Sequence, residues 1–181
     1  MTEPGTPLDA GRFATWLVEV EVALRGDGES DVPCGGCTAC CRSSQFVHLA
    51  PDEVEARARI PAELLFPAPR APEGHLLMGY DEDGRCPMLV DDACSIYEWR
   101  PRTCRTYDCR VFTAAGVDPD GATQPAIAEQ VRRWRFDEPT DEDRSLHAAV
   151  RAAADHVRDR AASPLHHALL AIEEHRDHLG R

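Results

Sequence analysis

The chain has 181 residues, a net charge of −12 at pH 7 and a pI near 5.0, and 43% of its residues are hydrophobic. This length predicts a single domain over residues 1–181 with a modest core. The negative charge repels phosphate groups, so it argues against a nucleic acid or an anionic membrane surface as the partner.

Helical spacing marks the first part of the chain. Thr6 and Pro7 are typical of a helix start, and Gly26 ends the helical pattern. Residues 26–33 then predict a polar loop that leads to the first cysteines. The apolar positions of the helix share one face: Phe13, Trp16, Leu17, Val20 and Leu24.

Short elements and irregular loops are expected in the middle of the chain. A helix opens after Pro51 and ends before Pro61, and residues 62–65 form at most one helical turn within a proline-rich loop. Residues 94–110 contain too much arginine, cysteine and proline for a regular element. Three strands are expected, the third returning after an acidic turn: residues 46–49, 75–80 and 86–90.

The last part of the chain has a helical pattern. Thr140 and Asp143 resemble a capping box, and Ser163 with Pro164 starts a final helix. An earlier helix opens at Pro125 and carries Ile127, Val131 and Trp134.

The predicted fold class is α+β. It comprises a small, irregular, cysteine-rich metal-binding centre with short strands over residues 34–109, flanked by N-terminal helices and by a helical C-terminal part over residues 125–180. The N-terminus lacks the basic and apolar segments of a signal peptide, and no apolar run is long enough to span a membrane, so a cytoplasmic location is expected. All 20 basic residues are arginine, a bias that indicates a GC-rich, bacterial genome.

The eight cysteines carry the chemistry, and the first four form a Cys-x2-Cys-x2-Cys-Cys run. Reducing conditions disfavour disulfides, and cysteines at two-residue gaps are typical of metal ligands. The spacing also opens the bacterial ferredoxin motif, in which a remote cysteine before proline completes a cluster; Cys86, followed by Pro87, fits that role. The candidate metal ligands are Cys34, Cys37, Cys40, Cys41, Cys86, Cys94, Cys104 and Cys109.

The adjacency of Cys40 and Cys41 leaves the number of sites open. Because successive side chains tend to diverge, the pair favours two neighbouring four-sulfur sites, whereas one site would leave the other cysteines as free or redox-active thiols. Arginines near Cys104 would offset thiolate charge or would simply be solvated. His48 and His75 are candidate ligands or acid–base groups, although a surface or structural role is favoured for each.

The cysteine pattern resembles a known family. The run from Cys34 to Cys41, then Cys86, then the segment Cys94-Ser-Ile-Tyr-Glu-Trp-Arg-Pro-Arg-Thr-Cys104-Arg105, closely resembles the CxxCxxCC (YkgJ-type) cysteine-cluster family, whose members are described as zinc- or iron-chelating. The resemblance covers about residues 34–109 and implies metal binding by the seven cysteines up to Cys104. Many members lack a cysteine at position 109.

Three functions follow from these observations. The first is an iron–sulfur protein with a redox or electron-transfer role, and the second is a zinc-stabilised protein-interaction module without catalysis. The third is a metal-dependent enzyme acting on a peptide or protein partner. Sulfur-only ligands favour iron slightly over zinc. No Ser-His-Asp, P-loop or Rossmann signature is present, so no catalytic residue is assigned.

Overall fold

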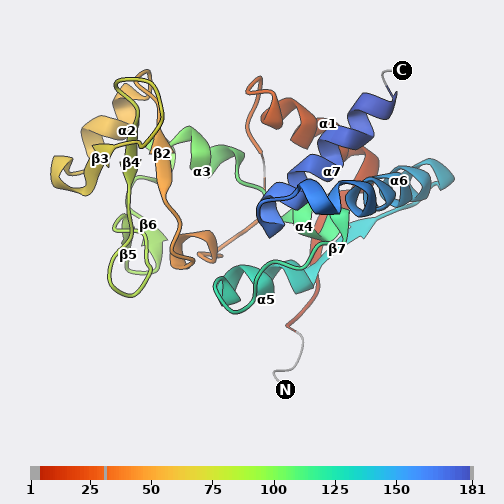
Figure 1. Cartoon of the computed structure of the whole chain (residues 1–181). Helices are drawn as coiled ribbons and strands as arrows, with labels where there is room; N and C mark the ends of the chain where they lie inside the picture. Colours follow the sequence, from red (N-terminus) through yellow and green to blue (C-terminus); the bar gives the residue numbers. More distant parts are fainter. Residues whose placement is uncertain (1–4, 31, 180–181) are drawn as a thin grey trace. The chain divides into compact units, whose positions relative to one another are not determined.

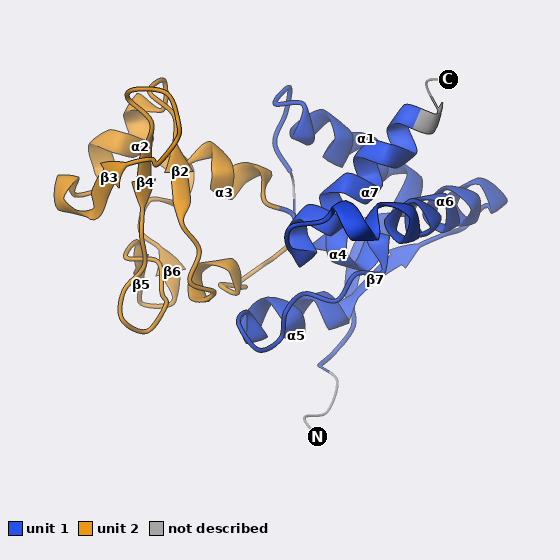
Figure 2. Cartoon of the chain, in the orientation of Figure 1, with its two compact units in different colours: residues 1–33, 108–181 blue, residues 34–107 orange. Residues whose placement is uncertain are grey.

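A computed structural model describes residues 5–30 and 32–179, with residues 178 and 179 in backbone only. The chain divides into two compact units, as Figure 2 shows: unit 1 comprises residues 1–33 and 108–181, and unit 2 comprises residues 34–107. Helices and short strands occur together, which confirms the α+β class. A single domain over the whole chain stays a prediction.

Unit 2 is built on a small antiparallel sheet in the order β2-β4-β3 (Figure 1). Its strands are β2 (Val47–Leu49), β3 (Leu65–Pro67) and β4 (Leu76–Met78). A separate hairpin pairs β5 (Leu89–Val90) with β6 (Ala93–Cys94). The helical elements are η1 (Cys40–Arg42), α2 (Val54–Arg59), η2 (Ala62–Leu64), η3 (Tyr97–Trp99) and α3 (Arg102–Thr106).

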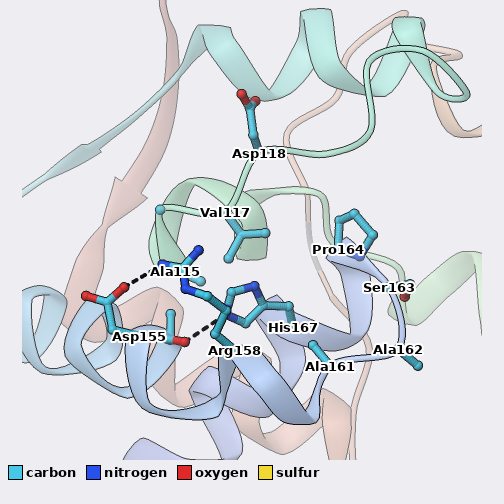
Figure 3. Close-up of a pocket in the computed structure, with 12 residues that line it drawn as sticks. Ala115, Val117, Asp118, Asp155, Arg158, Ala161, Ala162, Ser163, Pro164 and His167 are labelled. Carbon is cyan, nitrogen blue, oxygen red and sulfur yellow. Dashed lines mark hydrogen bonds and ion pairs between the residues drawn. The ribbon is translucent and has the colours of Figure 1, made fainter.

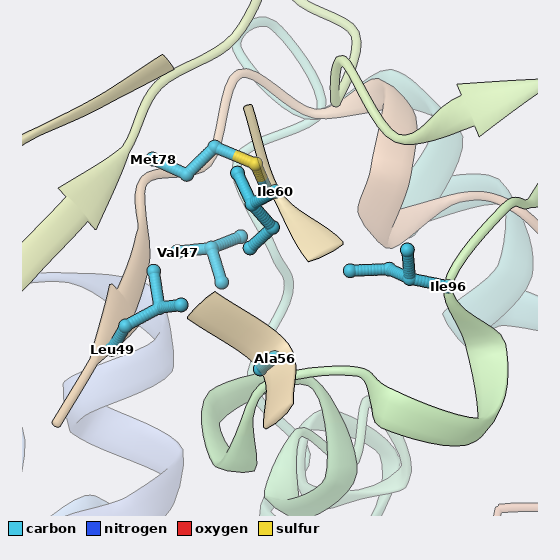
Figure 4. Packing of buried hydrophobic residues seen from close by; sticks show 6 residues of the cluster. All are labelled: Val47, Leu49, Ala56, Ile60, Met78 and Ile96. Carbon is cyan, nitrogen blue, oxygen red and sulfur yellow. The ribbon is translucent and has the colours of Figure 1, made fainter. Parts of the chain in front are cut away.

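The core of unit 2 is small. Alternation along β2 turns Val47 and Leu49 toward one face of the sheet, where Met78 of β4 meets them. Partly buried side chains around this core include Cys86 and Cys94, so two of the candidate ligands pack directly against it. Figure 4 shows its six buried members: Val47, Leu49, Ala56, Ile60, Met78 and Ile96.

Unit 1 joins two distant segments of the chain through a parallel pair, β1 (Leu8–Arg12) and β7 (Trp134–Asp137). The apolar face of α1 (Phe13–Leu24) is buried, and Gly26, with φ of +82°, follows its C-terminus. The other helical elements are α4 (Arg110–Ala115), α5 (Pro125–Arg133), α6 (Asp141–Val157), η4 (Arg158–Arg160) and α7 (Pro164–Leu179).

Asp143 connects the two ends of unit 1. Its backbone N–H donates to Thr140 Oγ1 at 3.2 Å, and its carboxylate accepts from the Thr140 N–H at 3.2 Å, so the predicted capping box is confirmed. The same carboxylate accepts from Arg12 Nε at 2.9 Å and from the Ala14 N–H at 3.1 Å. One buried side chain therefore caps α6 and fixes the start of α1.

Several expected elements are wrong in detail. The first helix begins at Phe13 and not near Thr6, because residues 8–12 pair with β7. Trp134 lies on β7 and not on the preceding helix. The third expected strand is shorter and pairs with β6, so it does not return to β4. Two short helices, α3 and α4, occupy or begin in the segment expected to be irregular.

Candidate metal centre

The first cysteines lie on a tightly turned loop. Gly35 has φ of +55°, in the left-handed region that favours glycine. The Cys37 N–H donates to the carbonyl of Cys34 at 3.0 Å, which closes a turn between the two residues. The Ala39 N–H then donates to Cys37 Sγ at 3.5 Å.

The next turn brings two adjacent thiols together. The Cys41 N–H donates to the Thr38 carbonyl at 3.0 Å, which shapes η1 and leaves Cys40 Sγ 3.9 Å from Cys41 Sγ. A tetrahedral ion with metal–sulfur bonds of about 2.3 Å holds two sulfurs about 3.8 Å apart. The expectation that these successive side chains diverge is therefore wrong.

The hairpin segment carries two further cysteines. The Cys86 N–H donates to the Cys41 carbonyl at 2.8 Å, which joins this segment to η1. The Leu89 N–H donates to the Cys86 carbonyl at 2.9 Å, and Cys94 pairs with Leu89 across the hairpin. Asp91 and Asp92, both with positive φ, form the intervening turn, so Cys86 and Cys94 belong to one local structure.

Cys104 lies on α3, where its N–H donates to the Pro101 carbonyl at 2.8 Å. Its pKa responds to the charges of cysteines on η1 and on the hairpin segment, so these thiols share one electrostatic environment. Four of these thiols have pKa values shifted by other cysteines, and Cys94 is one of the charges that shift them. We call the set the five-cysteine group: Cys40, Cys41, Cys86, Cys94 and Cys104.

The pKa values within this group diverge. The thiol hydrogen bond from Cys41 lowers the pKa of Cys40 to about 7 and raises that of Cys41. Loss of solvent raises the pKa of Cys86, with the charge of Cys94 contributing. Although Cys104 is an exposed residue, desolvation and then the charges of Cys40, Cys86 and Cys94 raise its pKa to about 12. Without a cation, Cys40 ionises readily, and its charge opposes the ionisation of Cys41, Cys86 and Cys104.

The arginines divide between different partners. Arg100 is the one whose charge lowers the pKa values of both Cys40 and Cys104. Arg102, a nearer neighbour of Cys104 in sequence, donates to Asp52 at 2.8 Å. Arg110 is buried in unit 1, where it donates to Asp108 at 2.8 Å. Charge compensation at the thiols is therefore assigned to Arg100.

The remaining candidate ligands have other surroundings. Cys34 and Cys37 are half-buried on the first loop, and Cys109 is buried in unit 1, where its sulfur accepts from Trp134 Nε1 at 3.2 Å. None of the eight cysteines is paired with another in a disulfide. Within residues 5–30 and 32–179, no three His, Cys, Asp or Glu side chains are already arranged to hold a metal ion. The eight-ligand assignment stays a prediction.

Unit 1 contains a separate cavity of about 600 Å³ between α4, α6 and the start of α7 (Figure 3). Its lining is largely engaged in internal contacts. Arg158 donates to Asp155 at 2.7 Å, and His167 Nε2 lies 2.7 Å from the carbonyl of Ala154. Because these side chains already bond to other protein groups, they do not form a cluster of polar groups directed at one point in the cavity. The five-cysteine group therefore remains the main candidate site.

Unit 2 is thus a cysteine-rich α+β unit that carries thiols on η1, on the hairpin segment and on α3. Residues 33–120 match the model of the CxxCxxCC family, described as "Putative zinc- or iron-chelating domain". These residues therefore form a CxxCxxCC domain, which confirms the resemblance and supports metal binding in general terms.

The matched range contains all of unit 2 and also residues 108–120 of unit 1. No curated protein and no solved structure matches the chain. Across the part of the chain that the structure describes, the helices are too short or too polar to cross a bilayer.

Proposed function

We propose that unit 2 holds one zinc ion through thiolates of the five-cysteine group, and that the ion fixes the loops of a protein-interaction module. The observation that carries this proposal is the 3.9 Å separation of Cys40 Sγ and Cys41 Sγ, which suits two ligands of one tetrahedral ion. Two of the three cysteines Cys86, Cys94 and Cys104 would complete the four ligands, with a shift of their side chains.

The donor set fits such an ion chemically. Thiolates are preferred by zinc and by iron in iron–sulfur clusters, and all five candidate donors in this group are sulfur. A cation offsets the repulsion that raises the pKa values of Cys86 and Cys104, so binding should release protons. The ion would also cross-link η1, the hairpin and α3 in a unit whose buried core has only six members.

An iron–sulfur cluster is the second candidate. It is favoured by the number of thiols, because the group contains five and the Cys-x2-Cys-x2-Cys run adds Cys34 and Cys37. Such a cluster would supply one-electron chemistry and a redox role. The close pair Cys40–Cys41 favours the single ion over this alternative.

Anaerobic purification followed by metal analysis and an absorption spectrum separates the two candidates. The proposal predicts one zinc per chain in this centre, no visible absorption, and loss of that zinc in Cys41→Ser. The matched control Cys109→Ser, in unit 1, should retain it. Stoichiometric iron and sulfide with visible absorption would instead establish the cluster.

The stabilising role needs its own measurement. Chelation should increase hydrogen exchange in peptides from residues 34–107 and leave peptides from α6 and α7 protected. Equal protection of residues 34–107 with and without zinc would contradict a structural role for the ion.

A further inference from the structure

Two imidazoles meet on the sheet of unit 2. His48 lies in the middle of β2, and His75 comes immediately before β4, its neighbour in the sheet. His48 Nε2 is 2.9 Å from His75 Nδ1, and the rings stack with centroids 5.0 Å apart and an interplanar angle of 26°. The sequence places these residues 27 positions apart, and only the strand pairing brings them together.

The backbone holds both histidines in place. Because Val47 and Leu49 point into the core, His48 between them lies on the opposite face of the sheet. Thr103 Oγ1 donates to the His48 carbonyl at 3.0 Å. The Ala68 N–H donates to the His75 carbonyl at 2.9 Å. Both side chains are half-buried and remain accessible to a small ion.

The nitrogen–nitrogen distance is close to that of two ligands on one metal. A tetrahedral zinc ion with bonds of about 2.0–2.1 Å holds two imidazole nitrogens about 3.3–3.4 Å apart. For a divalent ion to replace the shared hydrogen, the pair needs to open by about 0.4 Å and both rings need to turn so that their nitrogen lone pairs point at the ion. Neutral imidazole suits zinc, nickel and copper, whereas calcium and magnesium prefer oxygen.

We propose that His48 and His75 bind a first-row divalent transition metal ion at a second site, separate from the five-cysteine group. His48 Nε2 and His75 Nδ1 are the two protein donors. Among the described residues no third His, Cys, Asp or Glu side chain is grouped with them, so water or a bound ligand completes the coordination.

Two protein donors leave coordination positions for water or a substrate atom, unlike a closed structural site. This inference is independent of the proposed function, because it uses no cysteine. It also assigns His48 and His75 a metal-binding role, in place of the surface or structural role that the sequence favours for each.

The test counts zinc ions per chain by native mass spectrometry at a fixed excess of free zinc. The wild-type chain should bind one more zinc than His48→Gln or His75→Gln. The control His156→Gln, which changes an exposed histidine on α6, should bind as the wild type does. The Cys41→Ser variant should lose a different zinc and keep this one, so failure at one site is distinguishable from failure at the other.

A second readout needs no variant. In ¹⁵N spectra of the wild-type imidazoles, zinc should shift His48 Nε2 and His75 Nδ1 together, and nickel should broaden the same signals. Equal zinc counts in the wild-type and both glutamine variants, or unshifted nitrogens at saturating zinc, would overturn the proposal.

Discussion

The strongest prediction concerns the reactivity of Cys40 in the metal-free protein. The hydrogen bond from Cys41 is the largest cause that lowers its pKa from 9.0 to about 7. Cys41→Ala removes that donor, so the pKa of Cys40 should return toward 9.0. At pH 7 the thiolate fraction then falls from about one half to about one hundredth, roughly fiftyfold.

The reaction rate should fall by less than the thiolate fraction. A thiolate of higher pKa is the better nucleophile, and a Brønsted coefficient of about 0.4–0.5 over two pKa units returns a factor of about 6–10. The expected net loss at pH 7 is therefore about five- to eightfold. The assay is the rate at which an aromatic disulfide reagent modifies Cys40, resolved by peptide mass spectrometry, with Cys109→Ala as the control. An unchanged rate in Cys41→Ala would refute the assigned hydrogen bond.

Three further outcomes are expected, each from a different part of the structure. Leu49→Ala, at a fully buried position of unit 2, should lower the free energy of unfolding by about 2–5 kcal/mol in urea, while exposed Val54→Ala changes it by less than about 0.5 kcal/mol. Asp108→Ala removes the buried carboxylate that accepts from Arg110 and from Trp16 Nε1, so about 3–5 kcal/mol should be lost. An equal loss in Arg110→Ala alone would be consistent with this, and no loss in either variant would exclude the network. The folded-state pKa of Cys104 lies above its ordinary value, so the folded metal-free protein holds this proton more tightly than the unfolded chain does. Its free energy of unfolding should therefore be unaffected by Cys104 ionisation below pH 9 and should fall as the pH rises from about 9 toward 12. Unfolding curves in which Cys104→Ala loses as much stability over that range as the wild type would contradict this.

Local patterns predicted the elements whose determinants are local. The apolar face of α1 follows from helical spacing, and the capping box of Thr140 and Asp143 lies within four consecutive residues. The strand at residues 8–12 was missed because its partner is Trp134 and the residues after it, more than 120 positions away. No local signal contains that pairing, and tertiary contact overrode the helical start at Thr6.

The candidate site shows the same division. The cysteine spacing predicted sulfur ligands and the family, because both depend only on residue type and on spacing along the chain. The convergence of Cys40 and Cys41 depends on the 3-10 turn of η1, and the pairing of His48 with His75 depends on strand register. Backbone conformation sets both arrangements, and residue identities alone do not determine it.

Cys109, the last of the eight cysteines, has a structural role that requires no metal. Cys109 is buried in unit 1, and its sulfur accepts the indole N–H of Trp134, a donor that would otherwise be unsatisfied in the core. Buried cysteine commonly behaves as a small apolar residue with a weak sulfur acceptor. Cys109→Ala should therefore lower the free energy of unfolding by about 1–3 kcal/mol through the orphaned indole, with zinc content unchanged. Cys109→Ala together with Trp134→Phe, which removes the donor as well, should cost less than the sum of the two single variants; additive costs with a drop in zinc content would instead make Cys109 a ligand.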